Sequence, residues 1–265
     1  MVVVHDALAA RDMGGNGRPQ RQVGRQVNLW MTGGALACAS AGVLAYGARS
    51  RGSSLFAPSV YRGTRDRRSV ALTFDDGPSP ATVRMLDILD KHRAKATFFE
   101  CGANVRRYPA IAREVAAAGH EIGNHSDTHA LLSLRSTGFS ESELRRAQDA
   151  IAVAAGAAPT LFRAPYGVRW FGLREVQQQL GLLGVMWTVI GLDWKLGVAE
   201  MSDRIVKAAD NGAIICLHDG REMAAAPDVS NTIEAVRYLV PELLNRGYQF
   251  ETVTEILCPN SSLIA

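Results

Sequence analysis

The sequence has few cysteines and no cysteine pair of the CxxC type. Its four cysteines, Cys38, Cys101, Cys216 and Cys258, show no regular spacing. A disulfide framework needs paired cysteines at organised spacings, so this class of small stapled protein is excluded. We expect free thiols, which proteins usually bury as small apolar groups.

The sequence also lacks a large excess of charge and any biased segment. It has 29 Lys plus Arg against 26 Asp plus Glu, a formal net charge of +3 over 265 residues. A nucleic acid partner would need a dense basic face, so we expect none. Hydrophobic residues make up 47%, which is enough apolar side chain to bury a core and excludes a disordered chain. The length fits one large α/β domain with a short appendage.

The N-terminal part differs from the rest of the chain. Residues 1–26 form a basic leader, and residues 27–48 carry no charge. This run just meets the length of about 20 residues that a membrane span needs, although small residues dominate it. We interpret 27–48 as a signal anchor or signal peptide, so the protein is expected outside the cytoplasm, anchored to the membrane or secreted into the cell envelope. A buried Ala/Gly-rich helix and a disordered leader are the alternatives. Residues 49–68 are interpreted as a linker and 258–265 as a tail.

Apolar runs and helical patterns alternate over residues 69–257. The expected strands are 70–74, 96–101, 121–124, 161–163, 185–190, 213–217 and 248–252. The expected helices include 82–91, 109–118, one from a Ser140/Glu143 capping box to about 155, and 232–246, where Pro241 should kink or end the helix. Regular alternation predicts a parallel sheet with helices around it, either open or closed into a barrel.

Ionisable residues follow the expected strands at their carboxyl ends. They are Asp75 and Asp76, His125 with His129 four residues later, Arg163, Asp193 and His218. In parallel α/β folds these strand ends meet at one rim, where the loops form the active site. The sequence therefore predicts a functional site at this rim.

The types of residue at the rim indicate metal-assisted hydrolysis. His125 and His129, at i and i+4, form with one carboxylate a ligand set that suits Zn²⁺ or another divalent first-row metal. One member of the Asp75–Asp76 pair can bind the metal while the other takes a proton from water. A rim arginine would hold that base ionised. His218 can protonate a leaving group, with Asp193 favouring its imidazolium form.

Five segments, in order, resemble the motifs of the polysaccharide deacetylases of the NodB type, also called carbohydrate esterase family 4. They are residues 73–78 (TFDDGP), 125–129 (HSDTH), 163–166 (RAPY), 193–194 (DW) and 216–218 (CLH). The resemblance covers about residues 69–257. It implies a distorted parallel (β/α) barrel and a metal-dependent hydrolase that removes acetyl groups from sugars.

The resemblance also assigns roles to the metal ligands and the base. Asp76, His125 and His129 would hold one divalent metal, Zn²⁺ or else Co²⁺ or another first-row ion. Asp75 would be the general base, oriented by Arg163.

Further roles implied by the resemblance concern the acid and the substrate pocket. The backbone N–H of Tyr166 would stabilise the oxyanion, and His218, tuned by Asp193, would be the general acid. Trp194 would form a wall of the acetyl pocket, next to Pro165 of the RAPY motif.

Several positions depart from the family pattern or extend it. Ile190 stands where the family often has an aspartate, and Cys216 stands where it usually has an aliphatic residue. Cys216 and His218 share a face of a strand, so Cys216 should point into the same cavity. It is either a small apolar replacement or a thiol that perturbs metal binding or makes activity sensitive to oxidation. Trp170, Phe171 and Trp187 are candidates for stacking on a sugar, and for Trp187, inside an expected strand, core packing is the favoured alternative.

The sequence favours an N-deacetylase acting on N-acetylglucosamine-containing glycan, of peptidoglycan or chitin type, with release of acetate. An O-acetyl esterase acting on xylan or another polysaccharide would use the same site and depend less on His218. A non-catalytic glycan-binding protein is the third hypothesis, although binding alone needs no proton shuttle. The oligomeric state is left open.

Overall fold

The computed structural model describes residues 21–258, which fall into two compact units with a boundary between Leu44 and Ala45. Helix α1 (Arg21–Arg49) covers the uncharged stretch 27–48. Among residues 21–258, no helix combines the length and the hydropathy that a membrane span requires, so the anchor prediction is not confirmed. The leader up to residue 20 and the tail beyond Cys258 lie outside the described residues.

The second unit is built on a single parallel sheet. Its strands within the described residues are β1 (Ser59–Val60), β2 (Ser69–Gly77), β3 (Ala96–Glu100), β4 (Glu121–Asn124), β5 (Leu161–Phe162), β6 (Leu183–Val185), β7 (Val189–Ile190), β8 (Ala213–His218) and β9 (Gln249–Phe250). Their order is β1-β6-β5-β4-β3-β2-β8-β7, and β9 pairs with the start of β2. Every strand pair is parallel, as the βα alternation predicts.

The stretch 183–190 runs from one side of the sheet to the other. β6 pairs with β5, and β7, a few residues later, pairs with β8 at the other end of the sheet. The sequence predicted one strand over 185–190. The chain instead changes its hydrogen-bond partner within this stretch. The Met186 N–H donates to the Val60 carbonyl of β1 at 2.6 Å, and the Thr188 N–H donates to the Ile214 carbonyl of β8 at 2.8 Å. The expected distorted (β/α) barrel is thus confirmed, with this stretch split into two strands.

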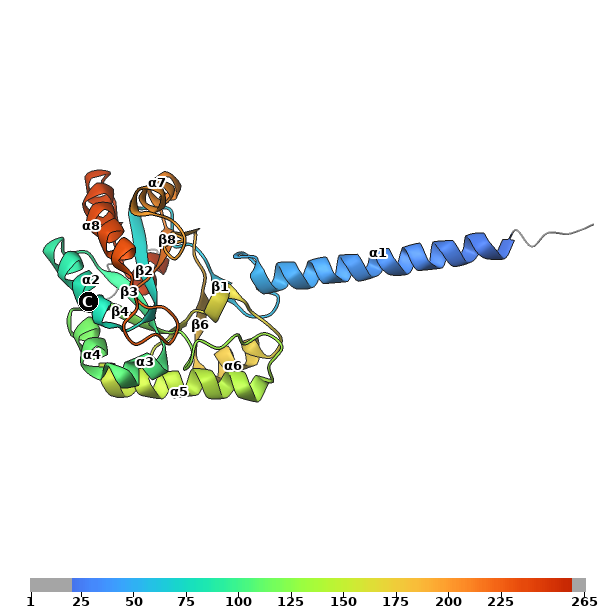
Figure 1. The fold of residues 1–265 in the computed structure, drawn as a ribbon, viewed down its shortest axis with the longest axis horizontal. Coiled ribbons are helices and arrows are strands. Elements are labelled where there is room, and N and C mark those ends of the chain that lie inside the picture. The colour runs from blue at the N-terminus through green and yellow to red at the C-terminus, as the bar shows by residue number, and fades with distance from the viewer. Residues whose placement is uncertain (1–20, 259–265) are drawn as a thin grey trace, which may run out of the picture. The chain divides into compact units, whose positions relative to one another are not determined.

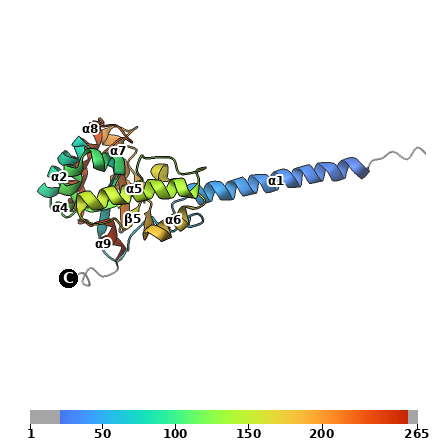
Figure 2. The same cartoon turned by 90° about the horizontal axis from the view of Figure 1, so that it is seen from below.

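Helices cover the outside of the barrel. They are α2 (Pro80–Lys91), α3 (Gly102–Arg107), α4 (Pro109–Ala117), α5 (Thr137–Ala155), α6 (Leu173–Leu180), α7 (Val198–Ala208), α8 (Ser230–Asn245) and α9 (Val253–Leu257). Contacts run from α7 through α8, α2, α4 and α5 to α6, so these helices form an outer layer beside the strands (Figure 1). In the view from below, α5 lies across the domain between α4 and α6 (Figure 2).

Two helix predictions need correction. α5 begins three residues before Ser140, because the Ser136 hydroxyl accepts the Phe139 N–H and caps the helix there (3.2 Å). Ser140 therefore lies within the first turns. α8 continues through Pro241 to Asn245, with Leu243 fully buried beyond the proline, so tertiary packing holds the last turn in place.

Residues 49–68 are part of the domain and not a linker. β1 pairs with β6 at the edge of the sheet, and the neighbouring Phe56 is only 5% exposed. Arg67 forms an ion pair with Glu251 at 2.7 Å, which ties the end of this segment to the C-terminal part of the barrel. An edge strand of two residues carries no periodic signal, which is why the sequence did not predict it.

Strand β2 lies inside the sheet, between β3 and β8, and all nine of its residues are buried. Phe74 stacks on Phe98 of β3, with ring centroids 5.0 Å apart. The continuous apolar run that predicted this strand is typical of parallel sheets covered on both faces. A rigid central strand of this kind fixes the position of the two aspartates at its end.

Candidate active site

The end of β2 directs two consecutive carboxylates to the same rim. Neighbouring residues of a regular strand point to opposite faces. Here the register with β3 shifts between Asp75 and Gly77, and Asp76 has a left-handed backbone conformation with φ 73°. Gly220 makes room for this bulge, because a Cβ there would overlap the backbone of Asp76. The strained conformation is of the kind found at functional sites, and it places both side chains where chemistry is expected.

Asp76, His125 and His129 converge as predicted. Asp76 Oδ1 lies 3.4 Å from His125 Nε2 and 3.2 Å from His129 Nε2, and one ligand atom from each residue lies within 4.8 Å of the others. All three side chains are buried. Asp76 Oδ1 has no hydrogen-bond partner despite its burial, which is costly unless a cation occupies the space in front of it.

The protonation of the two histidines also fits a cation. His125 Nδ1 lies 2.7 Å from the Arg163 carbonyl, and a carbonyl only accepts, so Nδ1 carries a proton and Nε2 is the nitrogen that faces Asp76. Burial, together with the nearby His125, lowers the pKa of His129 to about 4, so its ring is neutral at pH 7. One carboxylate oxygen and two imidazole lone pairs form a ligand set for Zn²⁺ or a similar ion.

Asp75 is held beside this cluster by a buried arginine. Arg163 Nη1 donates to Asp75 Oδ1 at 2.6 Å and to Thr73 Oγ1 at 2.7 Å, and the guanidinium lies over the Phe99 ring, 4.1 Å from its centroid. The Arg163 side chain is fully buried. Asp75 Oδ2 remains 4.0 Å from His125 Nε2, so this oxygen faces the cluster of Asp76, His125 and His129. The predicted contact between Asp75 and Arg163 is present in the structure.

His218 and Asp193 form the opposite side of the site. Asp193 Oδ1 lies 2.8 Å from His218 Nδ1, and Asp193 Oδ2 accepts from the backbone N–H of His218 at 2.9 Å and from the Thr232 hydroxyl at 2.8 Å. Burial alone would lower the pKa of His218, but the hydrogen bond and the charge of Asp193 raise it to about 9. The ring is therefore an imidazolium at pH 7 and can donate a proton from Nε2.

A cavity of about 460 Å³ joins these groups. Its lining includes Asp75, Asp76, His125, His129, Tyr166, Trp187, Ile190, Trp194, Cys216 and His218. Trp194 meets the His218 ring edge-on at 5.2 Å, and its side chain is half-exposed, which suits a wall that substrate touches.

Some residues lie elsewhere than predicted. Trp170 packs against Phe56 and Phe171, with centroids 5.4 Å apart in both cases, and is not among the residues that line the cavity. Pro165 is buried beside the lining residues and does not itself line the cavity. Trp187, for which core packing was the favoured of two alternatives, lines the cavity.

The loop after β8 contributes residues that the sequence did not indicate. The Glu222 N–H donates to Asp76 Oδ2 at 2.9 Å, and its carboxylate accepts from the Tyr166 hydroxyl at 3.1 Å. Arg221 donates to the backbone carbonyl of Asp193 at 3.1 Å. Burial raises the pKa of Asp219 to about 7. The signal available was their position directly after His218 at a strand's carboxyl end.

Comparisons with known proteins give a consistent result. Residues 62–185 match the family described as polysaccharide deacetylase. A chitooligosaccharide deacetylase from Bradyrhizobium sp. (strain ANU 289) is 37% identical over 205 residues, which cover 74% of this chain and 94% of the relative. The crystal structure of the Bc1960 peptidoglycan N-acetylglucosamine deacetylase has a TM-score of 0.70 at 28% identity, covering 76% of this chain and 92% of that one. A CE4 family pseudoenzyme from Bacillus anthracis has a TM-score of 0.69 at 28% identity, covering 77% and 70%. Because both a deacetylase and a pseudoenzyme share this fold, similarity of fold does not show activity, and the argument for activity depends on the site residues.

Proposed function

The chain belongs to the polysaccharide deacetylase family, and from this membership we propose that it removes N-acetyl groups from an N-acetylglucosamine-containing glycan of peptidoglycan or chitin type. As a family member it is a hydrolase that deacetylates glycans. The observation that carries the proposal is the convergence of Asp76, His125 and His129 beside Asp75, with His218 on the same cavity.

The proposal includes one divalent cation held by Asp76, His125 and His129, with Zn²⁺ favoured by the two imidazole ligands. Such a cation, when bound, polarises the acetyl carbonyl and lowers the pKa of a water molecule to about 7. The unpartnered Asp76 Oδ1 and the two facing Nε2 atoms support this assignment.

The protein groups then move the protons. Asp75 takes a proton from the attacking water, and the hydrogen bond from Arg163 orients the carboxylate. The Tyr166 backbone N–H stabilises the oxyanion of the tetrahedral intermediate. His218 donates its Nε2 proton to the departing amine, so water is added across the amide bond and the products are acetate and a free amino sugar.

An N-acetyl substrate is favoured over an O-acetyl ester by the His218–Asp193 pair. Amine departure needs a proton donor, whereas an alkoxide leaving group needs less protonation. Asp193 raises the pKa of His218 to about 9, so the donor is charged over the whole neutral range. The same pair weighs against a purely binding role, because holding a glycan does not need a protonated histidine opposite a buried base.

Acetate release from three substrates tests the proposal: chitin oligomers, peptidoglycan and acetylated xylan. We expect release from an N-acetylated glycan, loss of release after chelator treatment, and recovery when Zn²⁺ is added back. Release from xylan alone would show an O-acetyl esterase. Acetate release that survives complete removal of metal would overturn the proposal that a bound cation is required. Absence of release from every substrate would support a non-catalytic protein.

We further propose that the domain acts outside the cytoplasm. The uncharged stretch 27–48 follows several arginines and lies within α1, as in a segment that directs export. In cell fractionation, the full chain should appear with the envelope or medium and a chain lacking residues 1–44 should stay in the cytoplasm. The same cytoplasmic location for both chains would contradict this proposal.

A further inference from the structure

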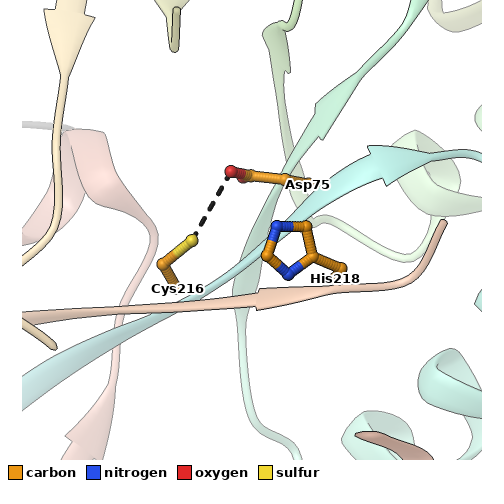
Figure 3. Close-up of side chains that lie close together, drawn as sticks. All are labelled: Asp75, Cys216 and His218. Carbon is orange, nitrogen blue, oxygen red and sulfur yellow. Dashed lines mark hydrogen bonds between the residues drawn. The ribbon is translucent and has the colours of Figure 1, made fainter. Parts of the chain in front are cut away.

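A second group of ligand atoms lies in the same cavity. One atom each from Asp75, Cys216 and His218 lies within 4.8 Å of the others, and Cys216 Sγ is 3.5 Å from Asp75 Oδ2. Figure 3 shows the three side chains around one space, Asp75 from β2 and the other two from β8. Cys216 and His218 are two residues apart on β8 and share a face, while Asp75 is paired with His218 across the two strands.

We propose that Asp75, Cys216 and His218 bind a second, thiophilic divalent cation, such as Zn²⁺ or Cd²⁺, and that this ion inhibits the enzyme. None of the three belongs to the set Asp76, His125 and His129. A thiolate, an imidazole and a carboxylate are all ligands that Zn²⁺ takes in proteins, and the thiolate selects against hard cations such as Mg²⁺. The inhibitory part rests on the proposed function, whereas the binding part does not.

The supporting hydrogen bonds of two ligands are already in place. His218 Nδ1 pairs with Asp193 Oδ1 at 2.8 Å, which leaves Nε2 for the ion in the carboxylate–histidine–metal arrangement typical of zinc sites. Arg163 orients Asp75 through Oδ1 and leaves Oδ2 on the side of Cys216. His218 thus has a hydrogen-bond partner on the ring nitrogen that does not face the ion, whereas the corresponding nitrogen of His129 in the first set, Nδ1, is buried without a partner.

Binding of the second cation in exchange for protons leaves the net charge of the site unchanged. Binding removes the thiol proton of Cys216 and the Nε2 proton of His218, so two protons leave as one doubly charged ion enters. Because both protons must leave before this second ion can bind, we expect it to act only when metal is in excess.

Occupation of this second site would stop the reaction at both proton-transfer steps. Asp75 could no longer accept the proton of water, and His218 would have none to give. Removal of general acid–base catalysis predicts a loss of activity of about 10²-fold or more at excess Zn²⁺.

Titration with Cd²⁺ tests the binding directly. The protein is the full chain with Cys38→Ser and Cys258→Ser, because these two thiols are exposed or half-exposed and would bind the ion on their own. We expect two Cd²⁺ per chain, the second accompanied by thiolate-to-cadmium charge-transfer absorption. Adding Cys216→Val should leave one Cd²⁺ and remove this absorption, whereas Cys101→Ala, which changes the other buried thiol, should keep both.

The outcomes separate the two proposals. A single Cd²⁺ without thiolate absorption, or absorption that is lost with Cys101→Ala and kept with Cys216→Val, would overturn the second site. If Cys216→Val does not fold, Cys216→Ala replaces it.

Excess Zn²⁺ should inhibit the chain that has Cys216. Each Cys216 variant should resist this inhibition when its activity at excess Zn²⁺ is compared with its own activity at one equivalent. If no glycan releases acetate, the function fails while the stoichiometry and the absorption still report on the second site.

Discussion

At the scale of single residues, Asp75, which is paired with the buried Arg163, can be changed to test the base while Asp76, His125 and His129 stay as they are. Asp75→Asn keeps the shape of the side chain but cannot take a proton. We expect kcat/KM for acetate release to fall by roughly 10²–10⁴-fold, the range typical of general acid–base groups. At one equivalent of metal, occupancy of the Asp76, His125 and His129 site should stay that of the parent, because Asp75 is not one of its three ligands and its Oδ2 is 4.0 Å from His125 Nε2. Activity close to that of the parent would show that another group is the base.

The pH dependence of the acid is set by Asp193. Its hydrogen bond and charge raise the pKa of His218 to about 9 against burial, so the acid is protonated below that pH and activity should fall as pH rises through it. Asp193→Asn lowers this pKa, and the alkaline limb of kcat/KM should move toward pH 7. The raised pKa also means that the ion pair stabilises the fold below about pH 6.5 and loses this contribution as pH rises toward 9. An alkaline limb that does not move in Asp193→Asn would assign it to another group.

Residues of the site were predictable to different degrees. Asp76 lies at the end of β2 and His125 directly follows β4, so the convergence of strand ends in a parallel sheet brings the two residues together whatever the course of the loops. Trp170 has no such constraint: its partner Phe56 lies more than a hundred residues away in a segment without periodicity. Glu222 reaches Asp76 through a backbone N–H, a contact that any residue type can make and that sequence alone cannot reveal.

At the scale of elements, the bulge at the end of β2 depends on Gly220 in the loop after β8. A Cβ at Gly220 would overlap the backbone oxygen of Asp76. We expect Gly220→Ala to lower the free energy of unfolding by about 1–3 kcal/mol, as overpacking does, and to weaken metal binding by moving Asp76. Gly138→Ala in α5 is the matched control: a Cβ there meets nothing within 4 Å, so it should leave stability unchanged or raise it by up to about 1 kcal/mol. Equal thermal unfolding and metal affinity in the two variants would contradict this role of Gly220.

Elements with their own apolar pattern were predicted well, and elements formed through distant contacts were not. β4 (Glu121–Asn124) has the predicted bounds, and β2 contains the predicted 70–74 run. β1 (Ser59–Val60) exists only because β6 pairs with it. The division of 183–190 into two strands reflects a change of neighbour along the chain, which periodicity does not encode.

At the scale of the whole molecule, the segment before β2 decides where the domain begins. Arg169 is buried and donates to the Ser53 carbonyl at 2.6 Å, and Phe56 is buried against Val168. A chain of residues 45–265 keeps these contacts, and we expect it to fold and to release acetate. A chain of residues 69–265, the domain predicted from sequence, loses the acceptors of a buried guanidinium and the burial of Phe56. Its free energy of unfolding should be lower by at least about 2 kcal/mol, because burial of one phenylalanine alone contributes about that much. Denaturant unfolding of the two chains measures the difference, and equal stability would show that residues 45–68 are dispensable to the fold.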